Sequence, residues 1–159
     1  MPRRVRPRFP EQWGVPDDPE LWVTWPQARE KLAKEEVYRV STSSRAGRPH
    51  AAPVWGVWKG DRFYFETELH SVKGKNLMSN PRVVVHVQDG MDTVIVEGRA
   101  ARLRGSEHLE SLRRDYMDKY DYGPDWSDET RQVVFQVRPD VAHAWRAPRM
   151  HRSLVNFVF

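Results

Sequence analysis

Cysteine is missing from this chain of 159 residues. Its absence excludes disulfides, zinc–thiolate sites and thiol catalysis. The sequence also lacks any stretch that approaches the ~20 consecutive apolar residues of a membrane-spanning helix, and its first residues lack the apolar segment of a signal peptide. We therefore expect a soluble, cytoplasmic protein with no membrane span, in which any redox chemistry is supplied by a bound cofactor.

Positive charge is only in small excess, since the formal net charge is +4. The basic residues are interleaved with Asp and Glu along the chain. The aromatic residues are not paired with a continuous basic stripe, which disfavours nucleic-acid binding. One cationic cluster is clear, formed by Arg3, Arg4, Arg6 and Arg8 among prolines. We interpret residues 1–23 as an N-terminal arm, either solvated and disordered or docked on a second subunit or an acidic partner.

The remaining residues, 24–159, are enough for one domain with a single core. Thr24 and Gln27 form a capping-box pattern that predicts a helix ending near Glu35. Alternating apolar residues and turn signals then predict an antiparallel meander of three strands. These strands are expected at residues 37–43, 50–58 and 62–67.

A second short helix is predicted to begin at Ser71 and to end before Asn80. Residues 82–88 follow as a valine-rich strand that is expected to be buried on both faces. A helix from Ser106 to about Tyr116 is expected to place Leu109, Leu112 and Tyr116 on one stripe. Further strands are predicted at residues 93–103, 132–137 and 141–145. The fold class is therefore mainly β, with six or seven antiparallel strands and small peripheral helices.

The most informative segment is the helix start at residues 71–77, which follows a hairpin. Ser71 occupies the N-cap position, free backbone N–H groups follow it, and Lys73 adds a positive charge two residues later. Such a helix start can bind a phosphate. Lys73 and Lys75 also fit the exposed face of an ordinary short helix. The motif therefore indicates a phosphate site only in combination with the elements around it.

Other kinds of site find little support in the sequence. His50 and His86 have no second ligand-type residue at metal-binding spacing, so we expect no metal site and interpret both as hydrogen-bonding residues at strand ends. The sequence shows no Ser-His-Asp arrangement of a hydrolase and no glycine-rich nucleotide-binding fingerprint between a predicted strand and a predicted helix. The sequence identifies no catalytic residue.

The order of these elements resembles the pyridoxamine 5'-phosphate oxidase-like split β-barrel superfamily. The resemblance covers roughly residues 30–145 and includes the Pro-Val-Trp strand at 53–55, the Ser-x-Lys-x-x-Asn-Leu helix at 71–77, and the valine-rich strand that follows Asn80. Within the superfamily it is similar to the branch that uses the deazaflavin coenzyme F420. The segment after Trp145 matches the arginine-containing substrate motif of true pyridoxamine phosphate oxidases only loosely, which argues against vitamin B6 oxidation.

The resemblance implies a homodimeric split β-barrel with cofactors bound in clefts at the subunit interface. It implies that Pro53, Val54 and Trp55 lie beside the cofactor ring, with His50 in the same cleft. The phosphate side is implied to consist of Thr67, Ser71, Lys73 and Asn76. Gln88 and Trp145 are expected to reach the cofactor of the neighbouring subunit.

The implied activity is hydride transfer between a reduced cofactor and a flat, unsaturated small molecule. FMN is the alternative cofactor, and a flavin- or haem-binding module without turnover is the alternative function. We favour F420 because its phosphodiester and polyglutamate tail form an extended anion. Arg45, Arg48, Lys73 and Lys75 are expected to line a path for it, which the N-terminal arginines would extend.

Overall fold

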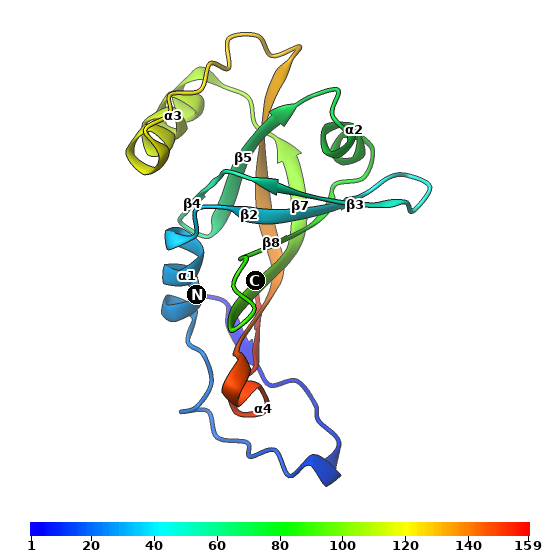
Figure 1. The fold of residues 1–159 in the computed structure, drawn as a ribbon, viewed down its shortest axis with the longest axis vertical. Coiled ribbons are helices and arrows are strands. Elements are labelled where there is room, and N and C mark those ends of the chain that lie inside the picture. The colour runs from blue at the N-terminus through cyan, green and yellow to red at the C-terminus, as the bar shows by residue number, and fades with distance from the viewer.

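The computed structural model describes residues 1–159, except for the side chain of Ser106. Within these residues, nine strands form one antiparallel sheet that curls into an open barrel (Figure 1). The strands are β1 (Arg3–Val5), β2 (Tyr38–Ser43), β3 (Pro49–Val54), β4 (Val57–Lys59), β5 (Arg62–Glu68), β6 (Arg82–His86), β7 (Asp92–Arg102), β8 (Gln132–Arg146) and β9 (Val155–Val158). The expected mainly β class is confirmed, with more strands than the six or seven predicted.

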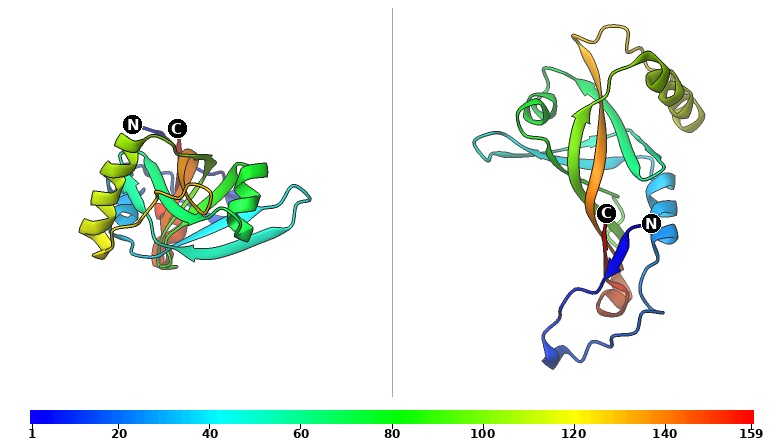
Figure 2. Two further views of the ribbon diagram at one scale, coloured as in Figure 1. Left: turned by 90° about the horizontal axis from the view of Figure 1, so that it is seen from above. Right: turned by 180° about the vertical axis from the view of Figure 1, so that it is seen from behind.

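Four α-helices and two 3₁₀ turns are found in the described residues and lie around the barrel (Figure 2). They are η1 (Glu11–Trp13), α1 (Trp25–Lys34), α2 (Val72–Ser79), α3 (Ser106–Tyr120), η2 (Ala147–Arg149) and α4 (Met150–Ser153). The capping box of α1 is confirmed, since the Thr24 and Gln27 side chains bond each other's backbone N–H groups. None of these helices, as far as the structure describes them, has the length and apolar character needed to cross a membrane.

Strand β8 organises the sheet. One of its edges pairs with β7 along almost its whole length, while the other edge pairs first with β5 and then with β9. Residues 132–137 and 141–145 were predicted as separate strands, but they belong to this one strand. Pro139 lies inside it, opposite a register shift between Glu97 and Gly98 of β7. A bulge of this kind tolerates a proline, which cannot donate a ladder hydrogen bond.

The predicted three-stranded meander is wrong in its strand pairing. Strand β5 pairs with β4 and β8, so β3 lies at one end of the strand order. The predicted strand at 50–58 is broken at Trp55 and Gly56. Beyond the break, Val57 packs in the apolar cluster beneath α3 and Trp58 packs in the barrel core, so both consecutive side chains are buried. Consecutive side chains of a strand point to opposite faces, and both faces of β4 are covered, one by the barrel core and the other by the cluster beneath α3.

Strand β6 is buried on one face only, contrary to the prediction. Val83 and Val85 are buried in the core, whereas Val84 and His86 are partly exposed on the opposite side. We call this opposite side of β3, β2, β6, β7 and β8 the outer face. Paired positions on it form a row across the sheet that consists of Ala51, Ser41, Val84, Glu97 and Val141.

The apolar residues form two clusters. The larger fills the barrel and includes the aromatic side chains of Tyr38, Phe63 and Phe65. The smaller lies beneath α3, where Leu112 and Tyr116 are buried and Leu109 packs against them. The predicted stripe on this helix is therefore confirmed, although α3 continues to Tyr120 rather than ending near Tyr116.

The N-terminal segment joins the same sheet. Strand β1 pairs with β9 near the C-terminus, so the interpretation of residues 1–23 as a disordered arm is wrong for Arg3–Val5 (Figure 2). The Arg6 guanidinium donates hydrogen bonds to the carbonyl groups of Leu154 (2.7 Å) and His151 (2.6 Å). This part of the chain therefore fastens the C-terminal turn of its own subunit.

Candidate functional site

The N-terminus of α2 is capped as the sequence predicts. Ser71 Oγ accepts a hydrogen bond from the Gly74 N–H (3.1 Å) and lies 3.0 Å from Thr67 Oγ1 at the end of β5. The N–H groups of Val72 and Lys73 lie in the first turn, where a helix has no partner of its own for them. Two hydroxyl groups and free N–H donors therefore converge at this helix start, an arrangement that suits an anion.

Close packing fixes the position of α2. A Cβ atom on Gly74 would lie only 2.5 Å from the Glu68 carbonyl oxygen and 2.6 Å from that of Leu69. The Asn76 side chain donates a buried hydrogen bond of 3.0 Å to Thr42 Oγ1 on β2. Asn76 was predicted to bind the cofactor, but its amide in this structure links α2 to the sheet.

The two lysines of α2 lie in different surroundings. Lys73 is half-buried beside the capped turn, whereas Lys75 is exposed. Among the described side chains, neither lysine forms an ion pair. The helix dipole adds a partial positive charge at the same end. Lys73 is therefore the side chain that can reach an anion bound at this helix start.

Strand β3 lies next to this helix and carries Pro53 and Val54, and Trp55 follows directly after it. Pro53 is exposed on the outer face and 47% of Trp55 is accessible, while Val54 is 8% exposed and packs in the core. Trp58, three residues further along, is only 8% exposed and packs in the barrel core. Trp55 therefore offers an accessible aromatic surface, whereas the Val54 side chain is buried and not accessible to a ligand.

His50 occupies the other side of β3, paired with Thr42. Its ring is half-buried, and among the described residues its Nδ1 atom has no hydrogen-bond partner. The interpretation of His50 as a residue that completes a hydrogen bond at a strand end is therefore wrong for Nδ1. An unpaired buried nitrogen is costly, and the nitrogens of Trp22 and Trp58 are buried without a partner in the same way.

The C-terminal turn of α3 holds the break between β3 and β4. The Tyr120 hydroxyl accepts from the Gly56 N–H (3.0 Å) and lies 2.7 Å from the Gly56 carbonyl oxygen. Its ring is stacked on Trp55, with centroids 4.8 Å apart and planes 3° apart, and Tyr122 meets Trp55 edge-on at 5.8 Å. These contacts fix the orientation of Trp55.

Lys119 completes this anchor and was not identified from the sequence. Its Nζ donates to the Gly56 carbonyl oxygen and to the Tyr38 hydroxyl, both at 3.0 Å. Burial lowers the pKa of Lys119 to about 8 and raises that of Tyr120 to about 12. The only signal in the sequence was a lysine that lies between Tyr116 and Tyr120 in the last turns of a helix.

Gln88 and Trp145 are separated from α2 within one chain. Gln88 is exposed and accepts a hydrogen bond of 3.0 Å from Arg39, which pairs with Pro53. Trp145 lies near the far end of β8, whereas Val133 of the same strand pairs with Thr67 beside α2. At ~3.3 Å per residue, the two ends of this interval are roughly 40 Å apart along the strand. The predicted site residues thus form one group at α2 and β3 and a remote one at Trp145.

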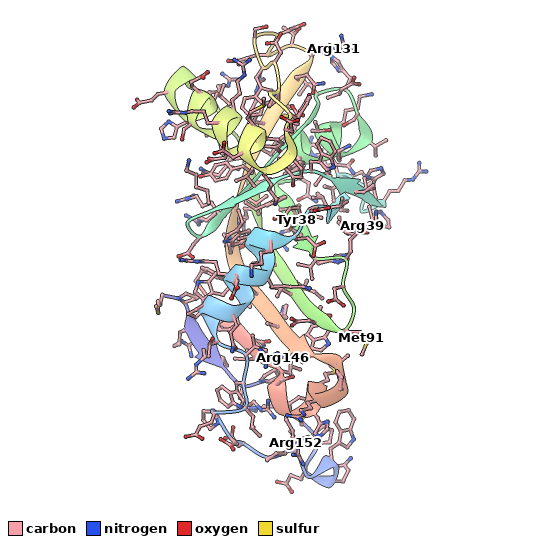
Figure 3. All side chains as sticks on the ribbon, turned by 60° about the vertical axis from the view of Figure 1, so that its left-hand side comes forward. Tyr38, Arg39, Met91, Arg131, Arg146 and Arg152 are labelled. Atoms are coloured by element: carbon pink, nitrogen blue, oxygen red, sulfur yellow. The ribbon has the colours of Figure 1, made fainter. Side chains whose placement is uncertain are left out.

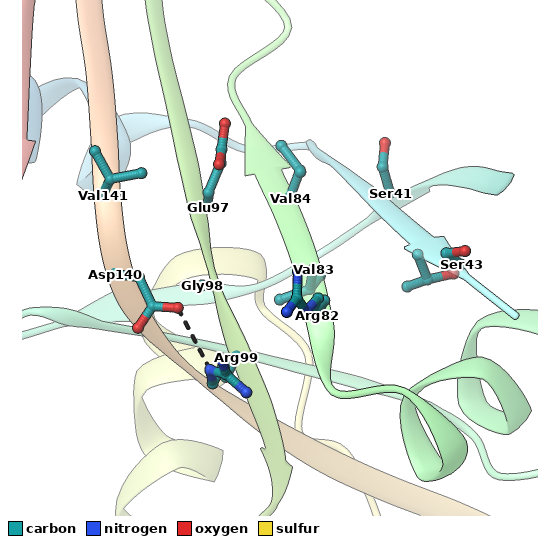
Figure 4. Close-up of a pocket in the computed structure, with 11 residues that line it drawn as sticks. Ser41, Ser43, Arg82, Val83, Val84, Glu97, Gly98, Arg99, Asp140 and Val141 are labelled. Carbon is teal, nitrogen blue, oxygen red and sulfur yellow. Dashed lines mark ion pairs between the residues drawn. The ribbon is translucent and has the colours of Figure 1, made fainter. Parts of the chain in front are cut away.

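An open groove of about 430 Å³ crosses the outer face between these groups (Figure 4). Arg82 and Arg99 are paired positions of β6 and β7, and Arg99 Nε lies 3.6 Å from the Asp140 carboxylate. Glu97 lines the same groove beside Val84 and Val141. The groove therefore combines two basic and two acidic side chains with an apolar floor.

Comparison with known protein families identifies the family of this chain. A sequence profile described as pyridoxamine 5'-phosphate oxidase matches residues 24–146, from the N-cap of α1 to the end of β8. The chain belongs to the pyridoxamine 5'-phosphate oxidase family. The resemblance inferred from the order of sequence elements is thereby confirmed at the level of the family. No curated protein matches the chain.

Several solved structures share the fold at low sequence identity. An F420 reductase is 23% identical, with a TM-score of 0.57 over 71% of this chain and 94% of its own. The haem storage protein of Vibrio cholerae is 16% identical, with a TM-score of 0.62 over 72% and 89%. A conserved hypothetical protein of Mycobacterium tuberculosis is 21% identical, with a TM-score of 0.69 over 85% and 89%. These similarities show the fold alone, so the identity of the ligand is inferred from the residues of the site.

Proposed function

We propose that this protein is a cytoplasmic, F420-dependent oxidoreductase that transfers a hydride between the deazaflavin and a flat, unsaturated organic substrate. The observation that carries the proposal is the capped start of α2, where Lys73 and two hydroxyl groups converge beside the strand that bears the exposed Trp55. The similarity to an F420 reductase supports the same choice.

The residues present fit a cofactor with a flat ring and an anionic chain. Ser71, Thr67 and the first N–H groups of α2 would bind the phosphate, with Lys73 adding a charge-assisted hydrogen bond. Trp55, held by Tyr120, would pack against the ring. The bound deazaflavin supplies the hydride-carrying atom. The protein's own part is to orient ring and substrate and to exclude water.

The choice of F420 over FMN depends on basic surface beyond the phosphate pocket. Arg45 and Arg48 are exposed in the turn between β2 and β3, and Lys75 is exposed on α2. They provide positive charge along which a polyglutamate tail would extend. The expectation that the N-terminal arginines extend this path is wrong for Arg6, because its guanidinium binds carbonyl groups of the C-terminal turn.

The substrate side would be aromatic. Trp55 and Tyr122 are 47% and 40% exposed and lie edge-to-face, so together they provide two walls of an apolar corner. Flat, poorly hydrated molecules stack well on such surfaces. This supports the proposal of a flat, unsaturated substrate.

The outer face supports a homodimer. A two-fold interface brings the same patch of both subunits together and therefore requires a self-complementary surface. The groove meets this requirement, because Arg82 and Arg99 of one subunit would face Glu97 and Asp140 of the other. In such a dimer we expect Trp145 and Gln88 of one subunit to reach the α2 site of the next, as the family resemblance implies. Sedimentation should report a dimer; a compact monomer at micromolar concentration that still binds cofactor would rule out the interface cleft.

Parallel fluorescence titrations with F420 and FMN, each at low and high salt, test the choice of cofactor. We expect F420 to bind more tightly, the difference to shrink as salt rises, and a shorter glutamate tail to weaken binding. Tighter FMN binding under both conditions would move the protein to the flavin-dependent branch.

Haem binding without turnover is a second candidate, because a similar structure is that of a haem storage protein. Histidine is a common haem-iron ligand, and His50 is a half-buried histidine on β3. Absorbance titration with haem provides the test. A haem spectrum that is lost in His50→Ala, together with no F420 binding, would select this function.

A further inference from the structure

The tight turn between β4 and β5 is held in place by its neighbours. Lys59 and Arg62 are the paired residues on either side of it. The turn itself consists of Gly60, whose φ of 61° favours glycine, and Asp61. The indole N–H of Trp25 on α1 donates to the Asp61 carboxylate at 3.2 Å. Figures 1 and 3 show this turn between α1 and α3 on one side of the barrel, so the fold fixes where its side chains start.

A hydrogen-bond network across β5 and β8 orients two donors beside this turn. Gln136 is paired with Tyr64, and its side-chain amide donates to the Tyr64 hydroxyl oxygen at 2.9 Å. The Arg62 guanidinium donates to the side-chain oxygen of Gln136 at 3.0 Å. Gln136 therefore uses both ends of its amide within the protein. The Tyr64 hydroxyl keeps its own proton, for which no acceptor is found among the described residues, and Arg62 keeps further N–H donors.

These donors line a cavity of about 310 Å³ between the turn and the first half of α3. We call it the turn pocket, and its wall includes Asp61, Arg62, Tyr64, His108 and Leu112. Its volume is at the lower end of the roughly 300 to 1,000 Å³ that ligand pockets have, so it suits a small molecule. Leu112 is 3% exposed and Tyr64 is 9% exposed, so both are buried in the molecule and form the floor of the pocket.

Two opposite charges on the wall of the turn pocket lack an ionic partner. Lys59 also lines the pocket, but Asp115 neutralises it at a distance of 2.6 Å. Asp61 and Arg62 are neighbours in the chain, yet among the described side chains neither forms an ion pair. A simple anion in the pocket would be repelled by Asp61, and a simple cation would be repelled by Arg62. A small molecule that carries both charges would be attracted to both residues.

We propose that the turn pocket binds a small aliphatic α-amino acid in its zwitterionic form. The carboxylate of the ligand accepts hydrogen bonds from the Arg62 guanidinium and the Tyr64 hydroxyl, and its ammonium group donates to the Asp61 carboxylate. Hydrogen bonds between ionised groups are the strong ones, so both ends of the ligand contribute to affinity. The buried Leu112 side chain offers an apolar surface to the aliphatic part of the ligand.

The turn pocket is distinct from the proposed cofactor site. None of the described residues that we propose to contact F420 lines it. His108 on its wall and Tyr120, which stacks on Trp55, lie roughly 18 Å apart along α3 at ~1.5 Å per residue. Amino-acid binding can therefore be measured without any cofactor, and its outcome does not depend on whether the protein uses F420.

Isothermal titration of the full chain with L-valine, isovalerate and isobutylamine tests the proposal. Isovalerate is valine without its ammonium group, and isobutylamine is valine without its carboxylate. The three probes therefore distinguish a site for a zwitterion from a site for a simple anion or a simple cation. We expect saturable binding of L-valine and at least about tenfold weaker binding of each of the other two probes.

Variants assign the binding to the turn pocket. Arg62→Gln and Asp61→Asn should each weaken L-valine binding at least about tenfold, because each removes one of the two charges. Arg62→Lys should keep part of the affinity, since it retains the charge and loses the planar fork. The matched control is Arg114→Gln, which removes a positive charge from an exposed position on α3 outside the pocket wall and should bind L-valine like the wild type.

Thermal unfolding checks that the variants stay folded, which we expect because Asp61 and Arg62 are both exposed. No saturable binding of L-valine by the wild type would overturn the proposal. Equally tight binding of isovalerate or isobutylamine would also overturn it, because the ligand would then need only one charge. An equal loss of affinity in Arg114→Gln and Arg62→Gln would do the same, since net charge rather than the turn pocket would then control binding.

Discussion

The start of α2 lies beside β3, the end of α3 holds the break between β3 and β4, and the two helix ends use lysine in opposite ways (Figure 1). At α2, Lys73 is half-buried beside a capped turn and has no ion-pair partner among the described side chains. At α3, Lys119 is directed inward, where its Nζ bonds the Gly56 carbonyl oxygen and the Tyr38 hydroxyl.

The difference separates a binding role from a positioning role. The α2 start leaves N–H donors and a positive charge available to a ligand. The α3 end uses its donors on the protein itself and thereby sets the direction of Trp55, the residue proposed to meet the ring. Changes at the α3 end should therefore alter stability, and changes at the α2 start should alter binding.

The largest expected effect is a loss of stability when a side chain is added at Gly56, in the break between β3 and β4. A Cβ on Gly56 would lie 2.3 Å from the Phe63 ring and 2.7 Å from the Tyr64 carbonyl oxygen. Gly56→Ala should lower the free energy of unfolding by about 3 kcal/mol or more, because the ring and the backbone must both shift. Urea unfolding measures it. Gly90→Ala is the control, since a Cβ there meets nothing within 4 Å, and an equal small effect of both changes would disprove the close contact.

A smaller effect is expected when the stacking surface is removed. Trp55→Ala should weaken F420 binding by about 0.5 to 1.5 kcal/mol, the range for aromatic pairs. Fluorescence titration measures the affinity. Trp13→Ala is the matched control, because Trp13 is 63% exposed on η1, and it should leave the affinity unchanged. Unaltered binding by Trp55→Ala would place the ring elsewhere.

The smallest effect is a change in pH dependence. Burial lowers the pKa of Lys119 to about 8, below the ~10.4 of an unfolded lysine. Between these values the unfolded state binds more protons, so Lys119 makes the free energy of unfolding rise with pH from about 8 to about 10. Lys119→Met should remove that rise. The wild-type advantage over the variant should therefore grow across this interval.

Urea unfolding at several pH values from 7 to 10 measures this advantage. Lys59→Met provides the comparison, since Lys59 forms a more exposed ion pair of 2.6 Å with Asp115 on the same helix. Identical pH profiles for both variants would contradict the account of Lys119.

Features that depend on local sequence were predictable. The caps at Thr24 and Ser71 and the buried stripe of α3 follow from nearby residue types. The order of these elements was also sufficient to identify the family, which the match to residues 24–146 confirms. Local hydrogen-bond geometry and side-chain periodicity determine such features before tertiary packing does.

Features that depend on distant partners were not predictable. The pairing of β5 with β8 joins segments far apart in the sequence, and β1 is ordered only because β9 lies beside it. The inward amide of Asn76 depends on Thr42, and the burial of Lys119 depends on Tyr38 and Gly56. Tertiary contacts override local preference at such positions, and a single sequence does not reveal which segments meet.

The central claim is that the start of α2 binds the phosphate of the cofactor, and a comparison of two neighbouring lysines tests it most directly. Fluorescence titration of Lys73→Ala and Lys75→Ala with F420 at low salt measures both affinities. Lys73→Ala should lose about 1.5 to 3 kcal/mol of binding free energy, the range for hydrogen bonds to charged groups, and Lys75→Ala much less, because Lys75 is exposed away from the capped turn. Equal affinities of the two variants would contradict the claim and remove Lys73 from the site.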